Sequence, residues 1–331
     1  MSAPAARLSP RPRVEWRDVD GILLLDKGRG MTSNAALQRA RRLFRARKAG
    51  HTGSLDPLAS GLLPVCFGQA TKVSGMLLDA DKTYSVTARL GVRTTTGDAE
   101  GEAIESAPVP ELDPGMLDTV LAGFVGTIDQ VPPMYSALKQ DGRRLYELAR
   151  KGIEVPREPR TVRILALHRT GWDGKDLSLE VRCSKGTYVR TLVEDISAAL
   201  GTVGHVIALR RTQLGPFRDE RMWSLEELEA LAGRDGEVAL GAALHPPDVA
   251  VRHWPEVELG EAEQAYVLQG QAVFASGPGG ARVRMYGPER RFLGVGQMSP
   301  EGRRVAPVRI MLDLAAGADT LKQLEAGDSR G

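Results

Sequence analysis

The feature that most constrains this chain is an aspartate held on a glycine-punctuated loop directly before an apolar run. Residues 50–61 read GHTGSLDPLASG, and the apolar segment LLPVCF follows at 62–67. Because Pro57 disfavours the helical region for Asp56 and has no N–H of its own, the aspartate is held extended at the end of the loop. The pattern therefore predicts a carboxylate whose direction is fixed by the backbone.

A second interpretation of the same residues is a helix N-terminus. Asp56 would then be the N-cap, Pro57 the first helical residue, and Gly61 the residue that closes the turn. Capping carboxylates are more common than reactive ones, so the loop taken alone favours the cap. Other features of the sequence are needed to distinguish a directed, reactive carboxylate from a helix N-cap.

Length and composition point to a globular protein with one large and one small domain. The chain has 331 residues, of which 42% are hydrophobic and 26% charged, which is ordinary for such proteins. The N-terminal residues contain no apolar signal-peptide core, and no run of about 18 apolar residues occurs. We therefore expect no membrane association and a cytoplasmic location.

The sequence offers no pattern typical of a metal or cofactor site. Cys66 and Cys183 are far apart, and the five histidines have no metal-ligand spacing, so buried free thiols are expected. Neither a phosphate-binding loop nor a dinucleotide fingerprint is present. We expect chemistry carried by side chains, without metal or cofactor.

Charge is segregated along the chain although the net charge is only +2. Residues 1–50 carry twelve basic against four acidic side chains, residues 51–130 four against eleven, and residues 131–170 nine against four. Such blocks are often solvated surface, but separated basic blocks are also how a protein of modest pI binds a polyanion. A nucleic acid is therefore a candidate partner.

Hydrophobic periodicity predicts a mixed α and β core. Strands are expected at 21–27, 84–90 and 177–183, together with a helix that is capped by Ser33 or Asn34, runs to Lys48 and carries arginines on its outer face. Residues 91–105 are expected to form an exposed connection. A further helix follows residues 184–187, which places Tyr188 and Arg190 at a strand-to-helix junction, where sites are commonly built.

The remaining segments predict the domain boundaries. Residues 1–19 are expected to be a disordered basic tail, 20–245 one domain, and about 131–163 a basic excursion from it with a helix at 145–151. From 246 to 314 short β segments separated by Gly and Pro predict a small all-β module. Residues 315–331 are expected to be a loose C-terminal tail.

With these elements placed, the chain resembles the bacterial tRNA pseudouridine-55 synthases, the TruB family. The resemblance covers about residues 20–245, with a PUA-like RNA-binding module after them, and favours the functional interpretation of Asp56 over the cap. It rests on six motifs in the family's order: Asp26-Lys27 with Gly30 and Ser33, residues 50–61, Lys82-Thr83-Tyr84, residues 134–139, residues 186–190, and Leu209-Arg210-Arg211. The chain has Gly28 where the family usually has proline. This difference affects the expected stiffness of the loop and not the expected chemistry.

The resemblance implies a fold and a reaction. The fold would be α+β, with a mixed, largely antiparallel sheet surrounded by helices, the excursion as a mobile thumb, and a β-rich C-terminal domain. The reaction would detach uracil from ribose at N1, turn it, and rejoin it through C5, at position 55 in the T-arm of tRNA. No cofactor, metal or obligatory protein partner is implied, and a monomer is expected.

The resemblance also implies roles for individual residues. Asp56 would be the nucleophile, attacking either C1′ of the sugar or C6 of the base, and Arg190 would hold it in a charge-assisted pair. Tyr84 would stack on the flipped base and serve in proton movement. Contacts with the substrate are implied for His51, Tyr188 and Leu209. Contacts with the RNA backbone are expected from Lys27, Arg39, Arg42, Arg143, Arg144, Lys151, Arg210 and Arg211.

Each of these residues has an ordinary structural interpretation as well. By residue type and position alone, the tyrosines and Leu209 could be core residues, His51 a surface group, and Arg190 a solvated arginine at a helix end. Two functional alternatives also remain open. One is the catalytic subunit of a guide-RNA-dependent pseudouridylation particle, and the other is an RNA-binding or tRNA-folding protein in which catalysis is incidental.

Overall fold

The structure is a computed structural model that describes residues 15–140 and 142–311. Its larger part is a nine-stranded sheet with the strand order β13-β1-β3-β12-β4-β11-β10-β7, and β2 pairs with β3 beside this path. All pairs are antiparallel except β3 with β12. The strands of this sheet are β1 (Gly21–Lys27), β2 (Ala49–His51), β3 (Ser60–Phe67), β4 (Lys82–Leu90), β7 (Gly126–Gln130), β10 (Arg160–Trp172), β11 (Asp176–Cys183), β12 (Gly204–Leu214) and β13 (Leu244–His245).

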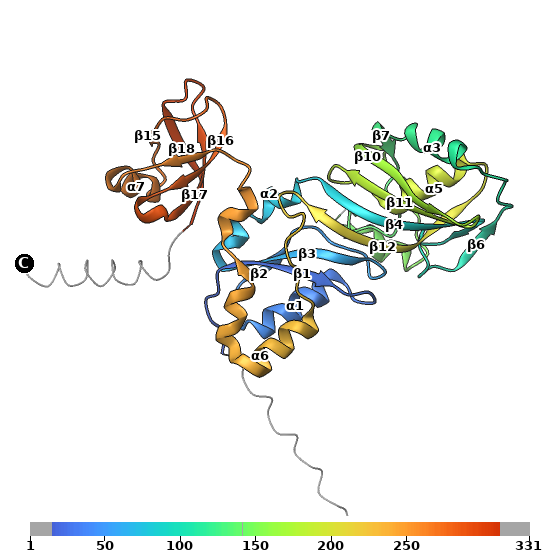
Figure 1. The fold of residues 1–331 in the computed structure, drawn as a ribbon, viewed down its shortest axis with the longest axis horizontal. Helices are drawn as coiled ribbons and strands as arrows, with labels where there is room; N and C mark the ends of the chain where they lie inside the picture. The colour runs from blue at the N-terminus through green and yellow to red at the C-terminus, as the bar shows by residue number, and fades with distance from the viewer. Residues whose placement is uncertain (1–14, 141, 312–331) are drawn as a thin grey trace, which may run out of the picture.

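Both faces of the sheet are covered around β1 and β3, which explains why these strands are continuous apolar runs. Leu23 and Leu25 belong to a buried cluster that includes residues of helices α1, α3, α5 and α6, while Ile22 and Leu24 belong to a second cluster with α2. Figure 1 shows α1 and α6 on one side of β1 and β3 and α2 on the other. The helices of this part are α1 (Ser33–Leu43), α2 (Ser74–Leu78), α3 (Pro114–Ala122), α4 (Leu145–Ala149), α5 (Val189–Ala199) and α6 (Leu225–Ala239).

Strand β12 approaches β3 so closely that only glycine fits at one position. Gly61 has φ +98°, and a Cβ there would lie 2.2 Å from the carbonyl oxygen of Arg211. Both the positive φ and the missing side chain are required, because any other residue would strain the backbone and clash with the neighbouring strand. This parallel contact brings the loop before β3 against the middle of β12.

Two short hairpins leave the sheet. One, formed by β5 (Val92–Thr94) and β6 (Ala103–Ser106), lies in the expected exposed connection. The other, formed by β8 (Lys139–Gln140) and β9 (Arg143–Arg144), precedes α4 in the basic excursion. The excursion ends where β10 begins at Arg160, slightly earlier than expected, and α4 ends before residue 151.

The C-terminal part is a five-stranded sheet with the order β14-β16-β17-β18-β15 and one helix, α7, which the sequence analysis did not anticipate. Figure 1 shows it standing beside the large sheet, on the side of α2. Tyr286 donates a hydrogen bond of 2.7 Å to Asp248, and Lys72 donates one of 2.7 Å to the carbonyl of Ile310, so the two parts are joined. The elements are β14 (Glu256–Glu258), α7 (Glu261–Leu268), β15 (Val273–Phe274), β16 (Arg282–Tyr286), β17 (Phe292–Met298) and β18 (Arg304–Ile310). The described residues also contain four 3-10 helices: η1 (Gly68–Lys72), η2 (Leu240–Ala243), η3 (Pro247–Val251) and η4 (Pro288–Arg290).

The expected domain boundary at residue 246 falls in the segment between the two sheets. His245, the last residue expected in the larger domain, pairs with Ile22 in the large sheet, and Ala250 of η3 is buried in a cluster with α2 and Met311. The small sheet begins only at Glu256. The Pro246-Pro247 pair marks the start of a short helix rather than a linker.

Part of the predicted disordered N-terminal tail, residues 15–19, is held in place. The backbone of Arg17 accepts from Arg47 and donates to Arg45, so residues 15–19 are fixed against the segment after α1, and residues 1–14 lie outside the described residues. The expected C-terminal tail, 315–331, lies outside them as well. Helix α1 begins at Ser33 with Thr32 as its N-cap, where Ser33 or Asn34 was expected as the cap. It ends at Leu43 instead of Lys48, because Arg45 adopts φ +49°.

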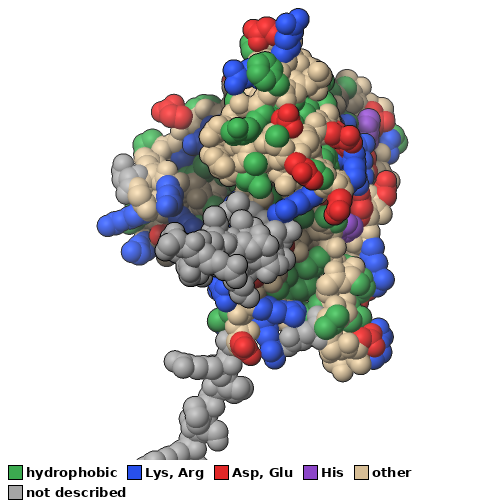
Figure 2. All heavy atoms as spheres, turned by 90° about the vertical axis from the view of Figure 1, so that its left-hand side faces the viewer, with side chains coloured by type: hydrophobic (Ala, Val, Ile, Leu, Met, Phe, Trp, Pro, Cys, Tyr) green, Lys and Arg blue, Asp and Glu red, His purple; other side chains and the backbone are tan. Residues whose placement is uncertain are grey.

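The described residues contain no helix with the length and hydropathy needed to span a membrane. On the face in Figure 2, which is the left-hand side of Figure 1, basic and acidic side chains are mixed over the surface.

Candidate active site

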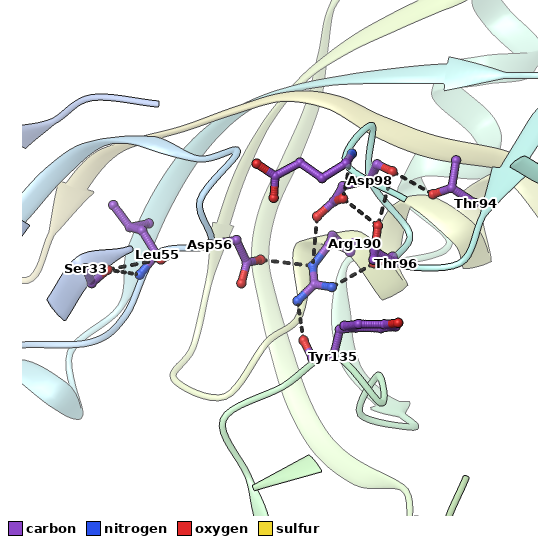
Figure 3. Close-up of polar contacts among 9 residues, drawn as sticks. Ser33, Leu55, Asp56, Thr94, Thr96, Asp98, Tyr135 and Arg190 are labelled. Atoms are coloured by element: carbon purple, nitrogen blue, oxygen red, sulfur yellow. Dashed lines mark hydrogen bonds and ion pairs between the residues drawn. The ribbon is translucent and has the colours of Figure 1, made fainter. Parts of the chain in front are cut away.

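The loop that carries Asp56 is fixed on both sides of the aspartate. Ser33 at the start of α1 donates to the carbonyl of Leu55 at 3.0 Å and accepts from its N–H at 2.7 Å (Figure 3). Beyond Asp56, the N–H of Gly30 donates to the carbonyl of Pro57. The interpretation of Asp56 as a helix N-cap is wrong, because strand β3 follows the loop and the side chain of Asp56 points to Arg190.

Arg190 is the partner of Asp56. Its Nε lies 2.9 Å from Oδ2 of Asp56, and its side chain is only 5% exposed. Nη1 donates to the carbonyl of Thr96 at 2.7 Å and Nη2 to the carbonyl of Tyr135 at 2.8 Å (Figure 3). A guanidinium held by three acceptors in its own plane has little freedom, so it fixes the direction of the Asp56 carboxylate.

A second carboxylate, Asp98, lies behind this pair. Its Oδ2 is 3.9 Å from Nε of Arg190, and its Oδ1 accepts from the hydroxyl of Thr96 at 2.6 Å and from the N–H of Glu100 at 3.1 Å. The sequence analysis placed this segment in an exposed connection and missed its role. The signal was present, because threonines beside Gly97-Asp98 are typical of a turn stabilised by side-chain hydrogen bonds.

The electrostatic environment of Asp56 contains opposing influences. Burial and the neighbouring charge of Asp98 raise the pKa of Asp56 above its ordinary value of 3.8, while Arg190 and Lys27 act to lower it. The side chain of Asp56 is 41% exposed, toward an open pocket, and protein surrounds its other sides. The carboxylate is therefore accessible to a substrate and poorly hydrated on the side away from it.

The pocket in front of Asp56 has a volume of about 310 Å³. It brings together five of the six residues predicted to be catalytic or to contact the substrate, namely Asp56, Tyr84, Tyr188, Arg190 and Leu209. Burial raises the pKa of both tyrosines, so their hydroxyls are neutral at physiological pH. The other lining residues are Gly53, Ser54, Leu55, Leu78, Lys82, Ser136, Ala137, Ser184, Gly186, Thr187, Val189 and Arg211.

Gln130 fixes the junction that carries Tyr188. Its side-chain amide donates to the carbonyl of Tyr188 at 3.3 Å and accepts from its N–H at 3.0 Å, and the residue is 2% exposed. Tyr188 is the N-cap of α5 and has no side-chain cap of its own. Gln130 thus connects the last residue of β7, directly before the basic excursion, to the helix that carries Arg190, and the sequence analysis missed it.

His51 lies on β2 and is not among the pocket-lining residues. Its Nδ1 is buried without a hydrogen-bond partner in the described part of the chain. Burial, followed by the charge of Arg211, lowers the pKa of His51, so the ring is neutral at physiological pH. The structure leaves its expected contact with the substrate as a prediction.

Two residues expected on the RNA backbone are buried, and that prediction is wrong for both. Lys27 is 0% exposed and donates to the carbonyls of Gly28 and Met31, and burial lowers its pKa to about 8. Arg211 is 1% exposed and donates to the carbonyls of Leu62 and Gly53. Both point to a covered face of their strand, whereas Arg210, the neighbour of Arg211 on β12, points to the other face and is partly exposed.

The other predicted RNA contacts lie at the surface, some of them in ion pairs. Arg210 forms two hydrogen bonds with Asp26, and Arg39 pairs with Glu229 at 2.7 Å. The remaining basic residues are exposed: Arg42, Arg143, Arg144 and Lys151. Within residues 15–140 and 142–311, no group of three or more His, Cys, Asp or Glu side chains is arranged to hold a metal ion.

Comparison with solved structures identifies the fold. The structure titled "Crystal Structure of a Cbf5-Nop10-Gar1 Complex" matches with a TM-score of 0.68 and 27% identity, covering 88% of this chain and 84% of that chain. "Structure of H/ACA RNP bound to a substrate RNA containing 2'-deoxyuridine" matches with the same TM-score at 24% identity, covering 88% and 85%. The fold is that of the pseudouridine synthases.

Comparison of sequences identifies the family. Residues 41–189 match the N-terminal domain of the TruB family pseudouridylate synthases, 190–252 the tRNA pseudouridylate synthase B C-terminal domain, and 255–311 a C-terminal domain of pseudouridine synthase II TruB. The tRNA pseudouridine synthase B of Nitrosococcus oceani is 53% identical over 90% of this chain and 97% of its own length. That of Yersinia pestis is 49% identical over 92% and 95%. The chain belongs to the TruB family.

Proposed function

We propose that this protein converts uridine to pseudouridine at position 55 in the T-loop of tRNA, with Asp56 as the nucleophile and without a cofactor. The observation that carries the proposal is the carboxylate of Asp56, which faces a pocket of about 310 Å³ and is fixed by Arg190 at 2.9 Å. A nucleophile needs an ionised, directed carboxylate with room for a substrate before it. The names of the relatives supply the class of RNA.

The reaction is an isomerisation in which atoms balance within the substrate. The bond between C1′ and N1 of the uridine breaks, and a bond between C1′ and C5 forms. The C5 proton leaves to a base, and N1 of the product carries a proton. Asp56 forms a covalent adduct at C1′ or at C6 while the uracil turns, and Tyr84, whose ring borders the pocket, stacks on it.

The target base has to leave its stack before it can reach Asp56. A pocket of this kind takes a flipped nucleotide, and the energy of unstacking is recovered from contacts in the pocket. Basic residues of the excursion, Arg143, Arg144 and Lys151, are exposed and available to bind the RNA backbone. The shape of the T-loop, together with the flipped base, then specifies the substrate.

Substitution Asp56→Asn tests the proposal. The amide keeps the shape of the carboxylate but cannot attack, so we expect loss of pseudouridine formation with tRNA affinity within about tenfold of wild type. Single-turnover release of tritium from C5-labelled tRNA measures pseudouridine formation, and filter binding measures tRNA affinity. A purified Asn variant that still forms pseudouridine would show that Asp56 is not the nucleophile.

A guide-RNA-dependent function is the second candidate, favoured by the structural neighbours from complexes with other proteins. The relatives at 49–54% identity bear the name tRNA pseudouridine synthase B, which favours action on tRNA alone. We expect the purified chain to modify an unmodified tRNA transcript without added protein or guide RNA. Activity that appears only after such an addition would favour the particle subunit.

A further inference from the structure

Lys82 is a buried cation on the wall of the active-site pocket. It is the first residue of β4, is 8% exposed, and lines the pocket. Its Nζ donates to the carbonyls of Leu78 at 2.7 Å and Ala80 at 2.6 Å, which are neutral acceptors. An ammonium group has three N–H bonds, so one remains for another acceptor. Leu78, at 44% exposure, marks this wall as part of the rim of the pocket.

The acidic residues near Lys82 are engaged elsewhere. Asp79 pairs with Lys185 at 2.7 Å, and Asp81 lies 3.4 Å from Arg182. Among residues 15–140 and 142–311, no carboxylate oxygen lies within 4.0 Å of Nζ of Lys82. Burial, followed by the charge of Arg211, lowers the pKa of Lys82 to about 8. A buried cation with no carboxylate in contact is costly, and an anion that entered the pocket would reduce that cost.

A second positive feature lies beside Lys82. In the register of the sheet, Lys82 is opposite Cys183, and the turn after Cys183 leads to the N-terminus of α5. Tyr188 caps this helix without a side-chain hydrogen bond, and no acidic residue occupies the first turn. The first N–H groups of a helix have no partner within it and attract anions. Residues 186–190 line the same pocket as Lys82.

We propose that Lys82 and the N-terminus of α5 form an anion subsite that binds a backbone phosphate adjacent to the target nucleotide. The inference rests on the proposed function, because it takes the ligand to be a nucleotide of an RNA chain. A nucleotide whose base lies near Asp56 carries its phosphates at the rim, where Lys82 lies. Arg211 contributes positive potential from behind, with its guanidinium held by the carbonyls of Leu62 and Gly53.

A neutralised phosphate in the RNA tests the subsite. T-loop stem-loops carry one methylphosphonate, either on the 5′ or on the 3′ side of the target uridine, and their Kd is measured with wild type and with Lys82→Met. For wild type we expect one of the two positions to weaken binding about tenfold or more. The same RNA should cost the Met variant less than about threefold, because the charge on the protein side is already absent. The salt slope of the Met variant should fall by about one unit.

Lys175→Met is the matched control, since Lys175 is an exposed lysine at the opposite end of β11. It should keep the wild-type penalty for each methylphosphonate. Equal penalties in wild type and Lys82→Met, or no penalty in wild type at either position, would overturn the subsite. Thermal unfolding reports whether the Met variant folds. If it does not fold, Lys82→Arg, which keeps the charge, replaces it, and the methylphosphonate should weaken RNA binding by this variant as much as it does for wild type. A Lys82→Arg variant whose affinity the methylphosphonate leaves unchanged would count against the proposal.

Two further measurements distinguish a failure of the anion subsite from a failure of the proposed function. Pseudouridine formation by wild type on the unmodified stem-loop tests the proposed function, whatever the methylphosphonates do. The shift of the Lys82 side-chain NMR signals on adding uridine 3′,5′-bisphosphate, compared with uridine and with inorganic phosphate, identifies the source of the anion. We expect a shift with the bisphosphate at concentrations where uridine gives none. A shift with inorganic phosphate at equal affinity would show a general anion site and overturn the assignment to RNA.

Discussion

At the scale of single residues, Arg190 does two things at once. One edge of its guanidinium holds Asp56, and its other nitrogens hold the backbone at Thr96 and Tyr135, which belong to two separate excursions from the sheet. Breaking any one of these contacts leaves a buried charge less well paired, which costs more than the contact itself gains. The direction of the Asp56 carboxylate therefore depends on residues far from it in sequence.

The raised pKa of Asp56 predicts the acid limb of the reaction. Because the carboxylate is the reacting form, the single-turnover rate should fall as the pH drops through a pKa above 3.8. Asp98→Asn removes a negative neighbour, so the limb should move to lower pH. Asp173→Asn, in an exposed turn, is the control and should leave it in place. A limb that Asp98→Asn leaves unmoved, or moves upward, contradicts the electrostatic account.

Tyr84→Phe separates the ring from the hydroxyl. The ring face remains for stacking, whereas the hydroxyl, which lies beside Arg211, is lost as a candidate proton carrier. We expect RNA affinity within about threefold of wild type and a loss of turnover of about a hundredfold or more. Rapid-quench measurement of the single-turnover rate tests this. An unchanged rate would show that the hydroxyl takes no part in the reaction and that Tyr84 only lines the pocket.

The sequence predicted the residues that belong to local motifs and misassigned those that depend on the sheet. Asp56, Tyr188 and Arg190 lie at a loop and a junction, which short-range patterns reveal. Lys27 and Arg211 were expected to contact the RNA backbone, but each points to a face of its strand that other elements cover. The contacts of Arg190 to main-chain carbonyls carry no side-chain signature at all.

At the scale of elements, the basic excursion is connected to the active site at its base. Gln130, at the end of β7, binds both main-chain groups of Tyr188, and the carbonyl of Tyr135 accepts from Arg190. The tip with β8, β9 and α4 projects basic side chains. The base of the excursion is therefore fixed to the pocket, whereas its tip carries exposed basic side chains.

Replacing Arg143, Arg144 and Lys151 by Ala tests the tip. Charges that contact phosphates act through counterion release, so tRNA binding should weaken and the slope of log K against log salt should fall by up to about three units. Chemistry on bound substrate should be affected less, although closure of the excursion over the RNA can slow it. Binding isotherms between 50 and 300 mM salt measure the slope.

A charge-matched triple variant, with Ala at the exposed residues Lys175, Arg221 and Arg234, is the control for the tip. It lowers the net charge equally, so any general loss of attraction appears in both variants. If the tip variant matches the control in affinity and slope, the tip is solvated surface, and other basic residues hold the RNA.

Strands and helices were mostly predictable from the sequence, and the short hairpins were not. The alternation in β4 and β11 and the apolar stripe of α5 are strong signals. Residues 91–105 are polar and rich in turn formers, so no periodicity marks the β5–β6 hairpin or shows that its turn reaches Arg190. Helix α7 has too weak an apolar stripe to be distinguished from its surroundings.

At the scale of the whole molecule, a buried tyrosine of the small sheet forms one of the hydrogen bonds that join the two parts. Tyr286 on β16 is 3% exposed and donates to Asp248 in η3, between the sheets. Burial, with Asp248 next, raises the pKa of Tyr286 to about 12. The fold therefore favours the neutral phenol over the phenolate.

The raised pKa of Tyr286 predicts a loss of stability at alkaline pH. The contribution is full below pH 10, the ordinary pKa of tyrosine, and is lost as the pH rises toward 12, by about 3 kcal/mol in total. Tyr286→Phe cannot ionise, so the variant should be less stable than wild type at pH 8, and the difference should shrink by pH 11. Urea unfolding at both pH values tests this, and a constant difference would contradict it.

The position of β12 has a consequence for synthesis. This strand, residues 204–214, lies between β3 and β4, which are made about 115 residues or more before it. A nascent chain on the ribosome therefore holds two sheet halves with a missing strand between them, and long-range pairing of this kind closes slowly. Since Leu209 and Arg211 line the pocket, a partly translated chain has no complete site, and RNA modification has to wait until the centre of the sheet is filled.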